Sequence, residues 1–332
     1  MGELIDWNRI VSLGADATPS DFGNPPREFA AVRSSAVVTP VRQFALLRFH
    51  GGEAKAFLQG QLTCDLEQVI SEQAQFGGYC TPKGRLLANF LLLCTPQGYL
   101  MYLAADIANA IAQRLRKFVM RAQVTIEHES GIGTLGVAGP QAQAVVTQAL
   151  GAPPPGRLAV MHHAAIDVVR LPGDSFLVVA PSGKMPDLWE RLINHAVPAG
   201  AECWNWAQIQ TGLPWITAAT QDQFLPQMIG LDAIGGVSFD KGCYTGQEIV
   251  ARSRYLGEIK RKLRLGSTPG LVRAGDQLFS REQHCGTVMN AASMPVGGSE
   301  FLAVMSAPAY GEASVETASG ETVALAGATT LD

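Results

Sequence analysis

One cysteine of this sequence lies where its neighbours favour a reactive thiol. Cys243 comes directly after Gly242 and three residues before Gly246, so the backbone can turn sharply there and leave the sulfur open to approach. The cation of Lys241 and a helix expected to begin near Gly246 would both lower the pKa of this thiol. Glu248 could orient a reacting group or move a proton. We therefore predict an activated thiol, against the alternative of an ordinary turn that contains a cysteine.

The other cysteines and the histidines give no comparable signal. None of the six cysteines has a partner at C-x-x-C spacing, so a structural zinc site is not expected. The adjacent pair His162 and His163 would point to opposite faces of a strand, which makes it a poor chelate. No histidine adjoins Cys243 in sequence, so a papain-type mechanism has little support. We predict no metal site.

The segment around Cys243 is also basic. From residue 238 to 264 it holds seven cations and three acids, a local charge of +4 in a chain whose net charge is −4. The cations are Lys241, Arg252, Arg254, Lys260, Arg261, Lys262 and Arg264. Such a stretch could hold an anionic ligand, either the glutamate tail of a cofactor or RNA phosphates. The alternative is a solvated charged face.

Repeated strand and helix patterns precede this segment. Residues 86–94 and 99–104 read as two strands, and a helix follows that we expect Asp106 to cap. Its predicted apolar face comprises Ile107, Ile111, Leu115 and Phe118. The same order recurs as strands over 165–171 and 176–180 and a helix over 186–195. Two strand–turn–strand–helix units predict an α+β fold with two related lobes of antiparallel sheet and helices.

The pattern changes after about residue 260. Short alternating segments are separated by glycines, and no helical periodicity occurs, which predicts a small C-terminal β-barrel. We therefore divide the chain into residues 1–260, containing both lobes, and residues 261–332.

Composition excludes several classes of protein. With 47% hydrophobic and 16% charged residues in a chain of 332, neither a disordered protein nor a coiled coil is expected. The net charge of −4 argues against a globally basic nucleic-acid binder. No apolar run is long enough to span a membrane, and no signal peptide is recognisable. We expect a cytoplasmic protein with no membrane contact.

The segment Lys241–Glu248 resembles the K-G-C-[aromatic]-x-G-Q-E signature of the YgfZ-type folate-binding proteins, which are relatives of the aminomethyltransferase (T-protein) of the glycine cleavage system. Gly242, Tyr244, Gly246 and Gln247 occupy its other defining positions. Further segments resemble the same family, and together they extend over about residues 40–330: Leu58–Asp65, Pro82–Arg85, Ile209–Pro214, Gln223–Gln227 and Leu231–Phe239.

This resemblance implies a fold, a cofactor and a role. The family has two related folate-binding lobes and a C-terminal β-barrel in a ring-like arrangement, with tetrahydrofolate as ligand. Its implied role is in making or repairing iron–sulfur proteins, including those that modify tRNA, so iron–sulfur client or assembly proteins are the expected partners. Cys243 would be the reactive or ligand-donating thiol, Lys241 would tune it, and Gln247 and Glu248 would fix the loop.

The sequence departs from the aminomethyltransferases at two acidic positions. Where those enzymes carry an acidic pair, this chain has Ala88 and Asn89, and Gln210 stands where a glutamate is expected. One-carbon transfer to tetrahydrofolate is therefore kept only as the alternative function, and whether the protein is an enzyme is left open. A non-catalytic RNA-binding protein using residues 252–264 is the third hypothesis.

Folate binding itself does not require those carboxylates. The resemblance implies an aromatic wall for the pterin or aminobenzoate ring, built from Phe44 and from Trp204 or Trp206. Asn89 and Gln210 would supply hydrogen bonds, and Arg254 would bind an anionic part of the cofactor. The alternative for the three aromatic residues is ordinary core packing.

Overall fold

The computed structural model describes residue 7 and residues 18–255, 260–306 and 314–328. Its contacts divide the chain into two compact units. The first unit contains the residues up to 45 together with 129–207, and the second contains residues 46–128 together with those from 208 onward. The predicted division at residue 260 stays a prediction.

The first unit is built on a six-stranded sheet with strand order β11-β1-β7-β10-β9-β8. Its strands are β1 Val37–Pro40, β7 Ile132–Ala138, β8 Val160–His163, β9 Ile166–Leu171, β10 Ser175–Pro181 and β11 Val197–Pro198. The helices are α2 Pro25–Ser34, α5 Ala142–Leu150, α6 Met185–Ile193 and α7 Ala201–Gln210, with a 3₁₀ turn η2 at Ser182–Lys184. Neighbouring strands of this sheet pair antiparallel, except β1 with β11, which are parallel.

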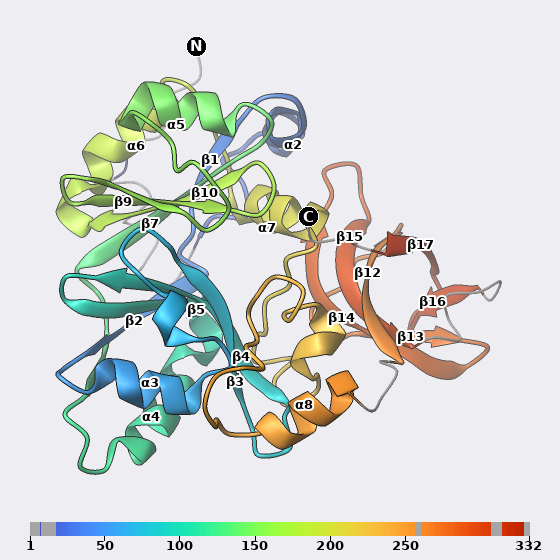
Figure 1. Ribbon diagram of the computed structural model, residues 1–332. Helices are drawn as coiled ribbons and strands as arrows, with labels where there is room; N and C mark the ends of the chain where they lie inside the picture. The colour runs from blue at the N-terminus through green and yellow to red at the C-terminus, as the bar shows by residue number, and fades with distance from the viewer. Residues whose placement is uncertain (1–6, 8–17, 256–259, 307–313, 329–332) are drawn as a thin grey trace. The chain divides into compact units, whose positions relative to one another are not determined.

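The helices α5 and α6 cover one face of this sheet (Figure 1). In α6, Leu188, Trp189 and Leu192 are buried. Leu192 follows the other two by four and three residues, a spacing that places all three on one face of the helix. They meet Phe176 and Val178 of β10 in the same core cluster. Burial of these side chains supplies the hydrophobic stabilisation of the first unit.

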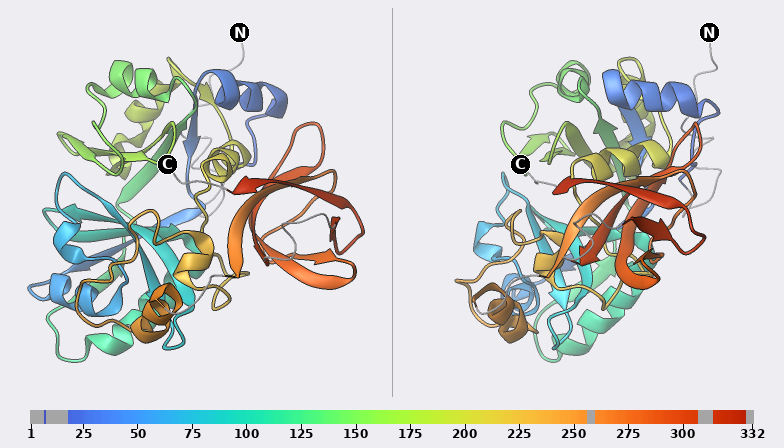
Figure 2. Two further views of the ribbon diagram at one scale, coloured as in Figure 1. Left: turned by 45° about the vertical axis from the view of Figure 1, so that its right-hand side comes forward. Right: turned by 90° about the vertical axis from the view of Figure 1, so that its right-hand side faces the viewer.

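The second unit holds a five-stranded sheet, β3-β4-β5-β2-β6, and a closed barrel, β12-β15-β14-β13-β16-β17. The sheet strands are β2 Phe44–His50, β3 Gln75–Cys80, β4 Leu86–Thr95, β5 Gly98–Ala104 and β6 Thr125–His128. The barrel strands are β12 Arg261–Thr268, β13 Gln277–Ser280, β14 Gln283–Ser293, β15 Ser299–Ser306, β16 Val315–Thr317 and β17 Thr322–Ala328. Figure 2 shows the barrel from two directions.

The remaining elements of the second unit are short except for one helix. They are α3 Ala54–Gln61, η1 Leu66–Gln68, α4 Ala105–Val119, η3 Pro226–Ile229 and α8 Gln247–Tyr255. No helix within the described part of the chain has the length and apolar character needed to cross a bilayer.

The predicted α+β fold with a C-terminal barrel is confirmed. The duplicated unit corresponds to β4-β5-α4 in the second unit and β9-β10-α6 in the first. Over the described residues beyond 260, strands occur and helices do not. The predicted ring-like arrangement of the parts stays a prediction.

Two predictions about α4 are wrong. Ala104, not Asp106, is the N-cap residue, and the Asp106 carboxylate instead accepts a hydrogen bond from the backbone N–H of Ala218 at 2.9 Å. Ile107, Ile111 and Leu115 are buried as predicted, but Phe118 is exposed. Phe118 lies one residue before the end of the helix and is 46% exposed, whereas the other three side chains are almost fully covered.

A link within the second unit joins the sheet to the barrel through residues 214–216. Asn89 of β4 donates from Nδ2 to the carbonyl of Pro214 at 2.8 Å and accepts at Oδ1 from the N–H of Ile216 at 2.7 Å. Asn290 of β14 accepts from the N–H of Trp215 at 2.7 Å and donates to its carbonyl at 3.0 Å. Two side-chain amides therefore satisfy the polar backbone groups of this segment.

A buried carboxylate organises the start of the first unit. Glu28, on α2, is 2% exposed. Its carboxylate accepts hydrogen bonds from the backbone N–H groups of Phe22 at 2.7 Å, Asn24 at 3.3 Å and Gly200 at 3.0 Å. Such charge-assisted bonds are stronger than neutral ones, so Glu28 ties the chain before α2 to the residue that precedes α7.

We predict that Glu28→Ala lowers the free energy of unfolding by about 2–4 kcal/mol, because it leaves buried N–H donors without acceptors. Glu28→Gln should cost less, since the amide retains one acceptor oxygen. Urea unfolding followed by circular dichroism measures both. The matched control is Glu67→Ala, which removes only an exposed pair with Lys55 and should leave the transition unchanged. An unchanged midpoint for Glu28→Ala would contradict this role.

Candidate functional site

The signature segment 241–248 forms a loop that leads directly into α8. The helix expected near Gly246 begins at Gln247. Cys243 and Glu248 are exposed, whereas Tyr244 is buried and Lys241 is half-buried. The loop therefore presents the thiol to solvent while side chains on either side of it anchor the backbone.

Lys241 is the principal anchor. Its ammonium donates to the carbonyls of Gln59 at 2.6 Å, Leu62 at 2.8 Å and Cys64 at 2.9 Å, at and just beyond the C-terminal end of α3. These carbonyls lie where a helix leaves its last acceptors unpaired and carries partial negative charge. Burial lowers the pKa of the Lys241 amino group, and the carboxylate of Asp65 acts in the opposite direction. The cation is thus held in a three-oxygen cage.

A compact turn follows Cys243. The backbone N–H of Tyr244 donates to Oε1 of Gln247 at 3.3 Å, and the N–H of Gln247 donates to the carbonyl of Tyr244 at 3.2 Å. The Lys241 nitrogen lies 5.4 Å from the centroid of the Tyr244 ring, a cation–π contact. Burial raises the pKa of the Tyr244 phenol. The turn is therefore closed by hydrogen bonds on one side and a buried ring on the other.

Any residue other than glycine at position 246 would force the backbone around it to shift. Its φ is +84°, and a Cβ there would lie 2.4 Å from the carbonyl oxygen of Thr81 and 2.9 Å from Cα of Gly84. The turn formed by residues 81–85 is closed by a bond from the N–H of Thr81 to the carbonyl of Arg85 at 2.8 Å. The signature loop thus packs backbone to backbone on this turn.

Two other polar residues, to which the sequence assigned no role, complete the support. The Thr63 hydroxyl donates to the carbonyl of Gly236 at 2.5 Å and accepts from the N–H of Gly78 at 2.7 Å. Gln227 donates to the carbonyl of Val250 in α8 at 2.6 Å. Both residues lie in segments that resemble the family, 58–65 and 223–227, and this resemblance is the sequence feature from which their supporting role could have been predicted. Four family segments, 58–65, 82–85, 223–227 and 231–239, therefore converge on the Cys243 loop and α8, all inside the second unit.

The other predicted residues of the second unit have defined partners. Asn89 is 1% exposed and uses both ends of its amide on residues 214–216. Gln210 is exposed and donates to Glu300 of β15 at 2.7 Å. The exposed Arg254 guanidinium lies 4.1 Å from the ring centroid of Phe239 and 6.0 Å from that of Tyr255. Their predicted roles toward folate stay predictions.

The predicted aromatic residues fall in the first unit, with Phe44 at its boundary, because β2 begins at Phe44 and the second unit begins at residue 46. Phe44 is half-buried, and Trp206 is half-buried with the Arg33 guanidinium 5.0 Å from its ring centroid. Trp204 is 1% exposed, and its ring fills the space beside Gly136, where a Cβ would lie only 2.3 Å from it. Trp204 therefore packs in the core of this unit, and Trp206 presents a ring already covered in part by a cation.

Two buried polar atoms beside Trp204 lack hydrogen-bond partners among the described residues. They are Nε1 of Trp204 itself and Oγ1 of Thr39. Thr39 is the cross-strand partner of Gly136, so its side chain lies on the face of the sheet that the indole covers. Buried polar groups are normally satisfied. An unpaired donor next to an unpaired hydroxyl is what a polar heterocyclic ligand would complete.

Comparisons with known proteins extend over nearly the whole chain. Residues 1–241 match the family described as the GCVT N-terminal domain. The tRNA-modifying protein YgfZ of Escherichia fergusonii is 31% identical over 282 residues, covering 82% of this chain and 86% of that protein. The protein of the same name from Escherichia coli O157:H7 is 32% identical over the same length. The aminomethyltransferase T of the glycine cleavage system from Bartonella henselae superposes with a TM-score of 0.70 at 20% identity, covering 92% of this chain and 88% of that structure.

We predict that Lys241→Met lowers the free energy of unfolding by about 1–3 kcal/mol, because three carbonyls lose their shared donor. Lys241→Arg should also destabilise, since a flat guanidinium does not fit a cage built for an ammonium. Urea unfolding measures both, and Lys55→Met, which loses one exposed ion pair, is the control that should not change the midpoint.

The same variants report on the thiol. If Lys241 also tunes Cys243, the pH profile for its reaction with DTNB should shift to higher pH in Lys241→Met. The buried thiols of Cys64 and Cys80, whose pKa is raised by burial to about 12, should not contribute in the folded state. An unshifted profile together with a lowered stability would restrict Lys241 to positioning the loop.

Proposed function

Because the chain belongs to the GCVT N-terminal domain family and to its YgfZ group, we propose that it is a tetrahydrofolate-binding accessory protein for iron–sulfur cluster assembly or repair. Through iron–sulfur enzymes it would support tRNA modification, in keeping with the name of its relatives. The observation that carries this proposal is an intact, anchored Cys243 loop in a chain that lacks the carboxylates expected of an aminomethyltransferase.

The first unit offers a fit for the pterin ring. Trp204 Nε1 is a buried donor and Thr39 Oγ1 a buried donor or acceptor, both without a partner in the described chain. A pterin carries ring nitrogens and an oxygen that match such groups, and its flat face suits an aromatic neighbour such as Trp206. When bound, tetrahydrofolate would supply a carrier for one-carbon units or a reduced ring. Asn89, Gln210 and Arg254, which belong to the second unit, stay proposed as folate contacts on the family resemblance alone.

One-carbon transfer of the glycine-cleavage kind has less support. The likeness to the Bartonella henselae structure is one of fold, at 20% identity. Asn89 stands at an acidic position of those enzymes and has both ends of its amide engaged in hydrogen bonds. An amide so held has no basicity with which to accept a proton. Position 89 therefore supplies no general base for that step.

The thiol of Cys243 is proposed as the group that acts on clients, as nucleophile, redox thiol or cluster ligand. It is the one cysteine classed as exposed, and the other five are buried or half-buried. A rigid loop with an exposed thiol suits contact with a second protein. A weak RNA contact through 252–264 is retained as a minor proposal; Arg252 and Arg254 are exposed, while positions 256–259 lie outside the described residues. A cytoplasmic location is likewise proposed.

We expect tetrahydrofolate to bind with heat measurable by titration calorimetry and with a change in tryptophan emission. Trp206→Leu should weaken binding about tenfold, because a flat ring contact is lost. Val296→Ser, an exposed apolar residue of the barrel, is the matched control and should bind normally. Absence of both heat and emission change in the unaltered protein would refute the folate part of the proposal.

The thiol is tested separately in cells that lack the protein. We expect Cys243→Ala to fail to restore iron–sulfur enzyme activity while it binds tetrahydrofolate as well as the unaltered chain does. Cys94→Ala, which removes a half-buried thiol from β4, should restore activity in full. Full rescue by Cys243→Ala would remove the thiol from the mechanism and leave folate binding untouched.

A further inference from the structure

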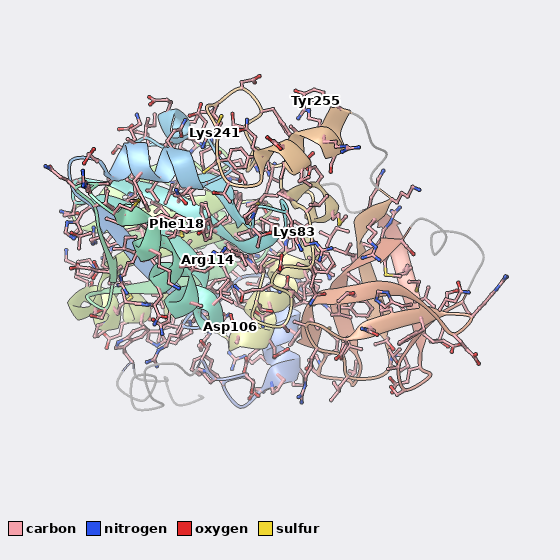
Figure 3. The ribbon with its side chains drawn as sticks, turned by 90° about the horizontal axis from the view of Figure 1, so that it is seen from below. Lys83, Asp106, Arg114, Phe118, Lys241 and Tyr255 are labelled. Atoms are coloured by element: carbon pink, nitrogen blue, oxygen red, sulfur yellow. The ribbon has the colours of Figure 1, made fainter. Side chains whose placement is uncertain are left out.

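The C-terminal end of α4 exposes two large apolar side chains. Phe118 is 46% exposed and Met120, the residue that ends the helix, is 89% exposed. Figure 3 looks onto this part of the second unit and labels Phe118 and Arg114 on the helix. Single exposed apolar residues are common on protein surfaces. Two of this size within three residues at the end of one helix are not explained by the folding of this unit.

The backbone at Met120 adds an independent observation. Its φ is +45° and its ψ is −103°, a combination that favours glycine and costs an L-residue free energy. With the side chain almost fully exposed, packing inside the protein returns little of that cost. The chain therefore holds a methionine in water, in a conformation where glycine would be more stable.

The surroundings of the two apolar residues are basic. Residues 107–126 contain four cations and no acid: Arg114, Arg116, Lys117 and Arg121. Arg116 has a structural function, because its guanidinium donates twice to the carbonyl of Ile126, at 2.7 and 3.1 Å. Cations near a helix C-terminus also favour the helix. Neither fact accounts for Lys117 and Arg121 flanking exposed apolar side chains.

We propose that Arg114, Lys117, Phe118, Met120 and Arg121, here named the α4 tip, form a docking site for an acidic segment of a protein partner. An apolar side chain of that segment would lie against Phe118 and Met120, and its carboxylates would pair with the flanking cations. Methionine suits this task because its flexible thioether adapts to partner side chains of different shape. The site lies on α4, apart from the Cys243 loop, and does not depend on the proposed function.

Two other classes of partner fit the α4 tip less well. Nucleic-acid sites stack successive bases on aromatic rings, whereas the α4 tip offers one ring, that of Phe118, beside a methionine thioether that cannot stack. An anionic membrane surface is commonly bound by about four to eight clustered cations, and the α4 tip has three, Arg114, Lys117 and Arg121. Glu53 lies close to this segment, because it accepts from the N–H of Gln123 at 2.7 Å, and the three cations of the α4 tip outnumber its single negative charge.

The test uses the full chain and a fluorescein-labelled synthetic peptide in which leucine and phenylalanine alternate with aspartate and glutamate. We expect a saturable rise in anisotropy that weakens as salt increases. Lys117→Glu combined with Arg121→Glu should reduce the affinity about tenfold, and Met120→Gly about fivefold. Because glycine suits the backbone at 120, the melting temperature of Met120→Gly should be unchanged or higher.

Matched controls are Lys184→Glu for charge and Val296→Ser for exposed apolar surface; both should bind the peptide normally. Absence of saturable binding, or equal affinity in Met120→Gly, would overturn the proposal. So would equal binding of a peptide with lysine in place of the acids. Single-stranded RNA or phosphatidylglycerol vesicles that bind in place of the peptide, and lose binding in the same variants, would replace the partner class. Folate binding should persist in every variant, which separates this result from the proposed function.

Discussion

The Cys243 loop depends on an ammonium group held by three carbonyl oxygens. Lys241 reaches the end of α3 and uses its donors on Gln59, Leu62 and Cys64. An ammonium removed from water needs such acceptors, and carbonyls at a helix end need a donor, so each satisfies the other. The loop is thereby attached to a helix that lies nearly two hundred residues earlier in the chain. Its thiol is exposed, yet the backbone that carries it has little freedom.

The residues after Cys243 restrict the loop in complementary ways. Gly246 permits contact between its backbone and the 81–85 turn, and Tyr244 fills buried space beneath the loop. Gln247 closes the turn by accepting from Tyr244, and Gln227 holds α8 by its Val250 carbonyl. The Cys243 sulfur is thus exposed on a loop whose neighbouring residues are buried or hydrogen-bonded. Such preorganisation suits a residue that must meet a second molecule in a fixed orientation.

Local patterns predicted much of this fold, whereas long-range pairings were beyond them. Alternation and helical periodicity indicated the duplicated β4-β5-α4 and β9-β10-α6 units, and the start of α8 near Gly246, because those features depend on neighbouring residues. The partners of Lys241 could not be predicted, since nothing in a single sequence links position 241 to carbonyls at 59–64. Phe118 was misassigned for a similar reason: periodicity shows which side of a helix is apolar, but not which of those side chains the rest of the fold covers. The prominence of Cys243 came from local chemistry and from the family signature together.

The hydrogen bonds of Asn89 also bear on how the sheet and the barrel of the second unit move. This side chain and Asn290 grip the peptide groups of residues 214–216 from opposite sides, one from β4 of the sheet and one from β14 of the barrel. Two side-chain amides thus bond the backbone of this segment as neighbouring strands would bond a strand. A displacement of the barrel would be transmitted through Trp215 to Asn89 on β4, the position where the family resemblance leads us to expect an acid. Asn89 thereby couples β4 mechanically to the barrel, so we expect the barrel and the sheet to move together.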